Sequence, residues 1–166
     1  PAVNGVTFSS RHPAEQGMGG PVEAEGRPAA NWNAAVWPVQ ETIAPGFFRT
    51  LGIRLPAGRE FSDVEAQSGG PQVVVVSENL ARRLWPGESA IGRRLRELPP
   101  PSKPDQQSPW MTVVGVAPDL PLRGVLNARL TPGYYVPFGQ RMPEQITVLV
   151  GVTGDPSLVA KPLRDV

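Results

Sequence analysis

The chain has 166 residues, a net charge of +1 at pH 7, 40% hydrophobic residues and 19% charged residues. A nearly neutral chain lacks the excess positive charge that binding to nucleic acid or to a strongly anionic membrane requires. The absence of cysteine excludes disulfide bonds, thiolate metal sites and cysteine nucleophiles. The 21 prolines and 18 glycines are spread between strand-like runs, so we expect many short elements joined by turns.

No stretch approaches the roughly 18 to 20 consecutive apolar residues that a membrane-spanning helix requires. The chain begins at Pro1 rather than at methionine, and it has no signal-peptide pattern. We therefore expect it to be a piece of a longer protein. The absence of a membrane segment here carries no conclusion about that longer protein.

The first third of the chain predicts strands separated by loops. Strands are expected over residues 3–8 and 22–25, and the loop over residues 9–20 contains the only histidine, His12. Residues 32–43 alternate between apolar and polar or small side chains, which is typical of a half-buried strand. Pro38 interrupts this alternation, so we expect an edge strand or a bulged strand.

A short helix is expected over residues 45–51. Pro45 suits the first helical position, the aromatic pair at 47–48 supplies an apolar face, and Gly52 suits the C-terminal cap. Ala44 offers no capping oxygen, which weakens this helix start.

The following segment predicts a short strand and a turn. The strand is expected within residues 53–61, with Gly58 at a turn or bulge. Ser62 and Asp63 can cap a brief helical turn, and residues 67–71 form a polar loop.

The clearest pattern covers residues 71–98, PQVVVVSENLARRLWPGESAIGRRLREL. Residues 73–76 are β-branched and apolar, as expected of a strand buried on both faces. Ser77 is expected to cap a helix, and the Pro-Gly pair at 86–87 to end it. A second strand is expected to start near Ile91, which gives a strand–helix–strand unit. The apolar side of the helix is predicted to carry Leu80, Ala81, Leu84 and Trp85.

The last part of the chain predicts three strands. Residues 99–109 contain too many prolines for a regular element, so we expect an extended loop between two antiparallel strands. A ligand for a proline-recognition domain is the alternative for this loop. The strands are expected over residues 110–116, 134–138 and 146–152, and Asp155 is expected to cap a final helix.

The motifs IAPGFFRTLGI, LPAGREF, VVVVSENLARRLWPGESAIGRRL and YYVPF follow one another over residues 40–160. In content and order they resemble the extracytoplasmic, MacB-like periplasmic core domain of MacB/FtsX-like ABC-transporter permeases, and most of all the large duplicated permeases without a fused ATPase. The family-motif positions, to which we assign structural roles, are Pro45, Gly46, Phe47, Phe48, Gly52, Gly58, Arg59, Asn79, Leu84, Trp85, Pro86 and Gly92.

The resemblance implies an α+β fold of short, mixed or antiparallel strands in two lobes. Residues 1–55 and 131–166 would form a porter-like α/β lobe, incomplete at both ends. Residues 56–130 would form a smaller inserted α/β lobe.

The resemblance also implies a function. The segment would be a periplasmic, extracytoplasmic and non-catalytic part of a cell-membrane protein that relays conformational change and contacts a substrate or a periplasmic partner. Its partners would be its own transmembrane helices, a separate cytoplasmic ATPase subunit that binds ATP, and a second copy in a homodimer. We expect no enzyme activity, no cofactor, no metal and no nucleic acid.

Two other functions compete with this one. A ligand-sensing or solute-binding domain would have a pocket lined by Trp32, Trp37 or Tyr134, which are also the candidates for an exposed contact surface. A hydrolase would use His12 as the base for a neighbouring serine, although a surface histidine is the simpler interpretation. No glycine-rich loop has the spacing or the lysine of a phosphate-binding loop.

The charged residues have plainer interpretations. Glu23 and Glu25 share one strand face and could bind a cation, but a solvated face is the favoured interpretation. Trp85 and Trp110 are expected to anchor the core. A local basic cluster is formed by Arg82, Arg83, Arg93, Arg94 and Arg96. We interpret it as a solvated surface, and the alternative is a binding site for an anionic partner.

Overall fold

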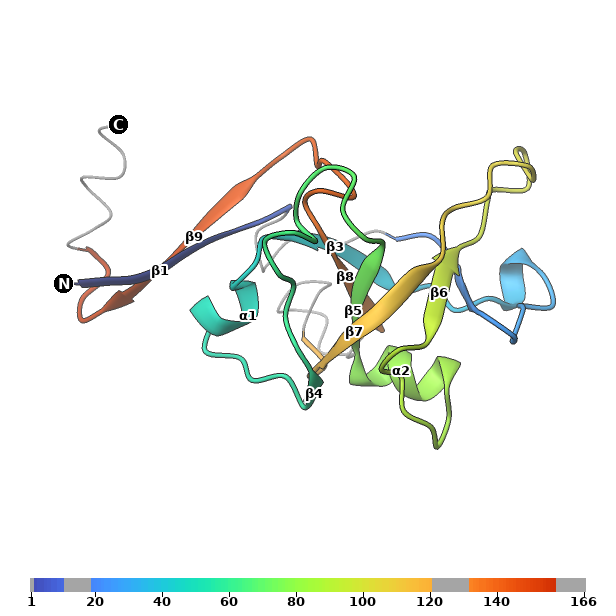
Figure 1. The fold of residues 1–166 in the computed structure, drawn as a ribbon, viewed down its shortest axis with the longest axis horizontal. Coiled ribbons are helices and arrows are strands. Elements are labelled where there is room, and N and C mark those ends of the chain that lie inside the picture. Colours follow the sequence, from blue (N-terminus) through green and yellow to red (C-terminus); the bar gives the residue numbers. More distant parts are fainter. Residues whose placement is uncertain (1, 11–18, 121–131, 158–166) are drawn as a thin grey trace.

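The computed structural model describes residues 2–10, 19–120 and 132–157 of the chain (Figure 1). The strands of this part are short, and its two α-helices span four and seven residues. In chain order the elements are β1 (Ala2–Ser9), β2 (Val22–Ala24), the 3-10 helix η1 (Trp32–Ala34), β3 (Val39–Ile43), α1 (Phe47–Thr50), β4 (Ala57–Gly58), β5 (Val73–Ser77), α2 (Glu78–Leu84), β6 (Arg94–Glu97), β7 (Met111–Ala117), β8 (Gly133–Pro137) and β9 (Thr147–Thr153).

The strands of the described residues form one nine-stranded mixed sheet. Its order is β2–β6–β7–β5–β8–β3–β1–β9, and β4 lies beside β7. The pairs β3–β8 and β5–β7 are parallel, whereas the other neighbours are antiparallel. The predicted α+β class with short mixed strands is therefore confirmed.

The β5–α2 unit forms as the sequence predicts. β5 is fully buried between β7 and β8, as its β-branched run requires. Ser77 caps α2, because its hydroxyl oxygen accepts a hydrogen bond from the Leu80 N–H at 3.2 Å. The helix ends at Leu84, two residues before Pro86, which cannot continue the hydrogen-bond ladder.

Residues 32–43 do not form a single strand. Trp32–Ala34 is the 3-10 helix η1, in which the Asn31 side-chain oxygen accepts a hydrogen bond from the Ala34 N–H at 2.9 Å. β3 begins only after Pro38 and lies between β8 and β1. The expected edge strand is therefore wrong, because an Asn-capped turn replaces the first half of the alternating pattern.

Two predicted element starts are also wrong. Helix α1 begins at Phe47 with Gly46 as its N-cap, so Pro45 precedes the helix and Ala44 plays no capping role. Gly46 has φ of +77°, which only glycine adopts without strain. β6 begins at Arg94 rather than near Ile91, because residues 91–92 form a turn.

The remaining strand predictions are confirmed by β1, β2, β7, β8 and β9. The proline-rich loop connects β6 and β7, which pair in antiparallel fashion as expected. Most of the predicted loop around His12 and the helix predicted after Asp155 lie outside the described residues.

Two hydrophobic clusters pack on the sheet through alternate residues of the same strands. Val76 and Tyr134 belong to the cluster that includes α2, whereas Val75 and Tyr135 belong to the cluster that includes α1. This follows from the two-residue period of a strand, which sends successive side chains to opposite faces. The core of the protein is therefore divided by the sheet into two layers.

The proposed division into two lobes stays a prediction. The proposed inserted lobe contains β5, and the porter-like lobe contains β8; these strands pair through Val75 with Tyr135 and Val76 with Tyr134. Both hydrophobic clusters contain residues from both proposed lobes. We call residues 75–77 of β5 and 133–135 of β8 the β5–β8 seam.

Candidate functional site

Trp32 and Trp37 form an aromatic pair at the surface. Their ring centroids lie 5.3 Å apart with an interplanar angle of 83°, which is an edge-to-face arrangement. Trp37 is exposed and Trp32 is half-buried. Their pairing through the η1 turn leaves an aromatic surface available to a partner, and its use as a contact surface stays a prediction.

Tyr134 lies elsewhere and is fully buried, so it is not available on the surface of the folded chain. Its hydroxyl donates a hydrogen bond to Glu97 Oε1 at 2.5 Å and lies 3.2 Å from Gln40 Oε1. Arg141 contacts the same two side chains. Burial, reinforced by the Glu97 carboxylate, raises the pKa of Tyr134 above its usual range. Tyr134 is thus a structural residue that joins three strands and a loop.

The hydrogen bonds of this network were not predicted from the sequence. Gln40, Glu97 and Arg141 are far apart in the chain and belong to no recognisable motif. Only the pairing of β3 with β8, and the positions of β6 and of the loop after β8, bring them together.

A serine hydroxyl links the two strands of the β5–β8 seam. Ser77 Oγ accepts a hydrogen bond from the Gly133 N–H at 3.1 Å in addition to its bond from Leu80. The residue that caps α2 therefore also fixes the start of β8.

The aromatic pair Phe47 and Phe48 packs against Tyr135. Phe48 lies 4.9 Å from the Tyr135 ring in an edge-to-face contact, and Phe47 lies 5.3 Å from Phe48. Gly46 and Gly52, which flank α1, both have positive φ. These family-motif residues hold α1 on the seam.

The LPAGREF motif, residues 55–61, contains β4 and lies beside β7. Gly58 has φ of +73°, and a Cβ atom there would lie 2.2 Å from the Val114 carbonyl oxygen. Arg59 donates two hydrogen bonds to Glu65, at 2.8 and 2.7 Å, and Ser62 donates to the same carboxylate. The Arg59 hydrogen bonds, together with those from Ser62, lower the pKa of Glu65 to about 2 despite its burial.

The remaining family-motif residues lie in α2 or in the segment that follows it. Leu84 and Trp85 are buried in the core, and Pro86 is exposed after the helix. The Asn79 N–H donates to Asp119 at 2.7 Å. Gly92 has φ of +80° and donates its N–H to the Val113 carbonyl at 2.8 Å, which ties the turn before β6 to β7.

Arginine partners change the interpretation of the acidic pair formed by Glu23, on β2, and Glu25, which follows that strand. Glu23 is buried and pairs with Arg96 at 2.7 Å, so the expected solvated face is wrong for this residue, whereas the exposed Glu25 pairs with Arg94. The Arg96 guanidinium also lies 4.4 Å from the ring centroid of Trp110, which is half-buried rather than a core anchor. Four of the five arginines in the predicted basic cluster form an ion pair within the chain.

Three hollows of the described surface can be compared with the predicted pocket. Those of about 460, 300 and 100 Å³ are lined by other residues than Trp32, Trp37 or Tyr134. Among the residues that the structure describes, no three His, Cys, Asp or Glu side chains are grouped to hold a metal ion. His12, the candidate base, lies outside the described ranges.

The model of one protein family, the MacB-like periplasmic core domain, matches residues 13–166. The chain belongs to this family. The resemblance seen in the sequence motifs is thereby confirmed. No curated protein matches this MacB-like domain at a significant level.

Solved structures share the fold of this MacB-like domain at low sequence identity. The periplasmic region of MacB from Actinobacillus actinomycetemcomitans is 18% identical with a TM-score of 0.61, and the match covers 98% of this chain and 65% of that one. A domain of a putative permease from Porphyromonas gingivalis is 20% identical with a TM-score of 0.63, over 99% and 69% of the two chains. The extracellular domain of the noncanonic ABC-type transporter YknZ from Gram-positive bacteria is 16% identical with a TM-score of 0.60, over 96% and 70%.

The chain thus spans 65–70% of the length of these neighbours. In the described parts of this MacB-like domain, no helix combines the length and the apolar character that crossing a membrane requires.

Proposed function

We propose that this MacB-like domain is the non-catalytic extracytoplasmic part of an ABC-transporter permease in the cell membrane. It relays conformational change from flanking membrane helices to a substrate or a periplasmic partner. ATP is bound by a separate cytoplasmic subunit. The family membership and the transporter neighbours support this role.

The observation that carries the proposal is the pairing of β1 with β9. These strands are antiparallel, and Ala2 lies opposite Thr153 (Figure 1). The segments that precede β1 and follow β9 therefore leave the domain at the same end of one two-stranded ribbon, and in this proposal they lead to the membrane helices. A displacement there is passed into the sheet through backbone hydrogen bonds.

The sheet provides a stiff path for such a displacement. From β1 it continues through β3 and β8 to β5, where the seam is locked by Ser77 and by the buried Tyr134 and Tyr135. Close-packed interiors transmit strain because they are little compressible. In this proposal the two lobes meet at the seam and move together.

The experiment measures distances in the full-length transporter with its ATPase. Spin labels replace Thr153 at the end of the ribbon and Lys103 in the β6–β7 loop, both of which are exposed. A third label is placed in a flanking membrane helix. Adding ATP should change the distance from the membrane label to Thr153, whereas the distance between Thr153 and Lys103 should stay the same. An unchanged first distance, or a changed second one, contradicts a rigid relay.

We further propose the Trp32–Trp37 pair as the contact surface. Hydroxyl-radical footprinting should oxidise Trp37 rapidly in the purified transporter and slowly in the intact cell envelope, where the partner is present. The buried Trp85 is the internal reference, because it should be protected in both states. Equal oxidation of Trp37 in both states removes this surface from the proposal.

A further inference from the structure

The β1–β9 ribbon has two unlike faces. The inward face consists of small or buried residues: Thr7 and Ser9 are buried, and a Cβ atom on Gly5 would lie 3.0 Å from the Thr50 hydroxyl oxygen on α1. Leu149 on β9 packs against the cluster that includes α1. This face therefore already has its partner within the domain.

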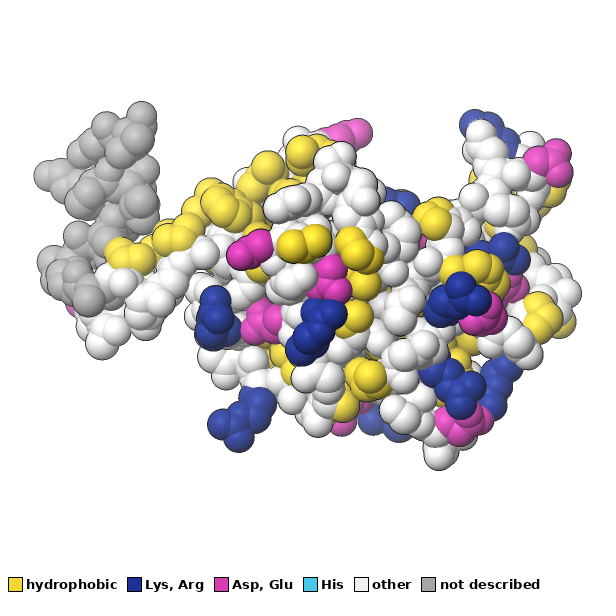
Figure 2. Space-filling view, viewed as in Figure 1, with side chains coloured by type: hydrophobic (Ala, Val, Ile, Leu, Met, Phe, Trp, Pro, Cys, Tyr) yellow, Lys and Arg dark blue, Asp and Glu magenta, His cyan; other side chains and the backbone are white. Residues whose placement is uncertain are grey.

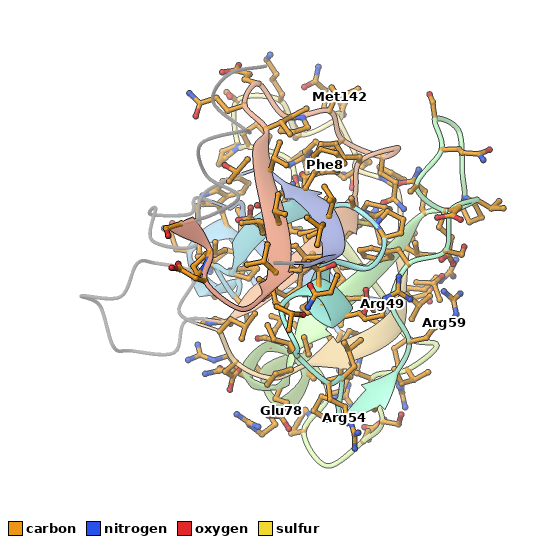
Figure 3. The ribbon with its side chains drawn as sticks, turned by 90° about the vertical axis from the view of Figure 1, so that its left-hand side faces the viewer. Phe8, Arg49, Arg54, Arg59, Glu78 and Met142 are labelled. Carbon is orange, nitrogen blue, oxygen red and sulfur yellow. The ribbon has the colours of Figure 1, made fainter. Side chains whose placement is uncertain are left out.

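The outward face is apolar and largely exposed, with Val150 and Val152 half-buried. Cross-strand pairing places Val6 opposite Val150 and Phe8 opposite Val148. Val6 is 53% exposed and Val148 is 55% exposed. Figure 2 shows hydrophobic side chains along this ribbon, and Figure 3 shows Phe8 on it with Met142 beyond the ribbon. We call the outward set the ribbon face: Val3, Val6, Phe8, Val148, Val150 and Val152.

The grouping of these residues is unusual for a free surface. Of the ten large hydrophobic residues that are exposed in the described part of the chain, six lie on β1, on β9 or in the segment just before β9. Scattered exposed apolar residues need no explanation, but a contiguous apolar patch marks an interaction site. The ribbon face is such a patch.

The chemistry of the ribbon selects an apolar polypeptide as the occupant. β1 and β9 contain no Lys, Arg, Asp or Glu. β9 is also the last strand of the described sheet, without the proline or the charged side chains that protect an exposed strand edge. An uncharged apolar face beside an open edge suits an added strand or the apolar side of a helix.

The structural neighbours indicate where that polypeptide comes from. They match 96–99% of this chain, yet this chain covers only 65–70% of theirs. About a third of each neighbouring domain therefore has no counterpart in these 166 residues. We propose that the ribbon face and the open edge of β9 are covered by a segment of the same polypeptide outside the 166 residues. This inference is independent of the proposed role in transport.

The test places a photo-crosslinking amino acid at Val148 in the full-length protein. Val6 is a second position on the same face, and Val64, which is 63% exposed outside the ribbon, is the matched control. Substitution of exposed side chains leaves the core intact. Products are separated by size, and the linked peptides are identified by mass spectrometry.

The expected product has the mass of one chain and links Val148 or Val6 to a peptide outside residues 1–166, at a yield severalfold above that of Val64. A link between two copies, a link to another protein or to lipid, or no excess over Val64 at either ribbon position overturns the proposal.

Discussion

The hydroxyl oxygen of Ser77 accepts a 3.1 Å hydrogen bond from the backbone N–H of Gly133, which lies 56 residues later in the chain. The same oxygen caps α2 through the Leu80 N–H. One side chain thus joins a local helix start to a long-range strand pair. We therefore expect this position to matter more than an ordinary helix cap.

Replacing Ser77 by alanine should lower the free energy of unfolding by about 2–4 kcal/mol, because a cap is lost and a buried N–H is left without its partner. Urea denaturation of the purified protein measures the change. Ser89→Ala, at an exposed position, is the control and should stay within about 0.5 kcal/mol of the wild type. A Ser77→Ala cost no larger than that of the control would show that the seam does not depend on this hydroxyl.

Loss of the hydroxyl should lower the stability of the protein at Tyr134 but not at Tyr135, although the two tyrosines are neighbours on β8. Tyr134→Phe removes a donor from Glu97 and should destabilise the protein by about 1–2 kcal/mol. The buried Tyr135 hydroxyl has no hydrogen-bond partner among the described residues, so Tyr135→Phe should be neutral or stabilising. Thermal and urea unfolding of both variants check the order, and a larger loss for Tyr135→Phe would contradict the network as we describe it.

Substitution of Gly58 tests the close approach of β4 to β7. Gly58→Ala combines a positive φ with a Cβ atom 2.2 Å from the Val114 carbonyl oxygen, and it should cost more than about 3 kcal/mol. Gly87→Ala shares the positive φ but has no atom within 4 Å, so it should cost only about 1–2 kcal/mol. Equal losses in unfolding free energy would mean that backbone strain alone, rather than the contact, decides the effect.

The lowered pKa of Glu65 predicts a specific loss of stability in acid. Its pKa falls from 4.5 in the unfolded chain to about 2 in the fold, so its ionised form stabilises the protein above pH 4.5. That contribution, about 1–3 kcal/mol, should be lost as the pH falls from about 4.5 to about 2. Glu65→Gln should be less stable than the wild type at pH 7, and the two should converge near pH 2.

The control for this pH dependence is Asp63→Asn, an exposed carboxylate in the same turn. Unfolding curves of the three proteins between pH 2 and pH 7 should show a reduced acid loss only for Glu65→Gln. If the difference in unfolding free energy between the wild type and Glu65→Gln is independent of pH, the hydrogen bonds from Arg59 do not hold the Glu65 carboxylate ionised.

The sequence by itself determined the elements whose signals are local. The β-branched run at 73–76, the Ser77 cap and the Pro-Gly stop predicted β5 and α2 correctly, because each signal acts on backbone groups within a few residues. The ordered motifs also determined the family. The start of α1 was predicted too early, and η1 was not predicted. Gly46 and Asn31 favour turn geometries that compete with the apolar pattern at these positions.

Only the tertiary structure decided which residues meet across the sheet. Tyr134 looked like a candidate for the surface, yet the pairing of β8 with β3 and β5 buries it against Gln40 and Glu97. The same holds for Glu23, which Arg96 of the neighbouring strand removes from solvent. Strand order and register depend on the summed burial of many distant side chains, so no short stretch of sequence contains that information.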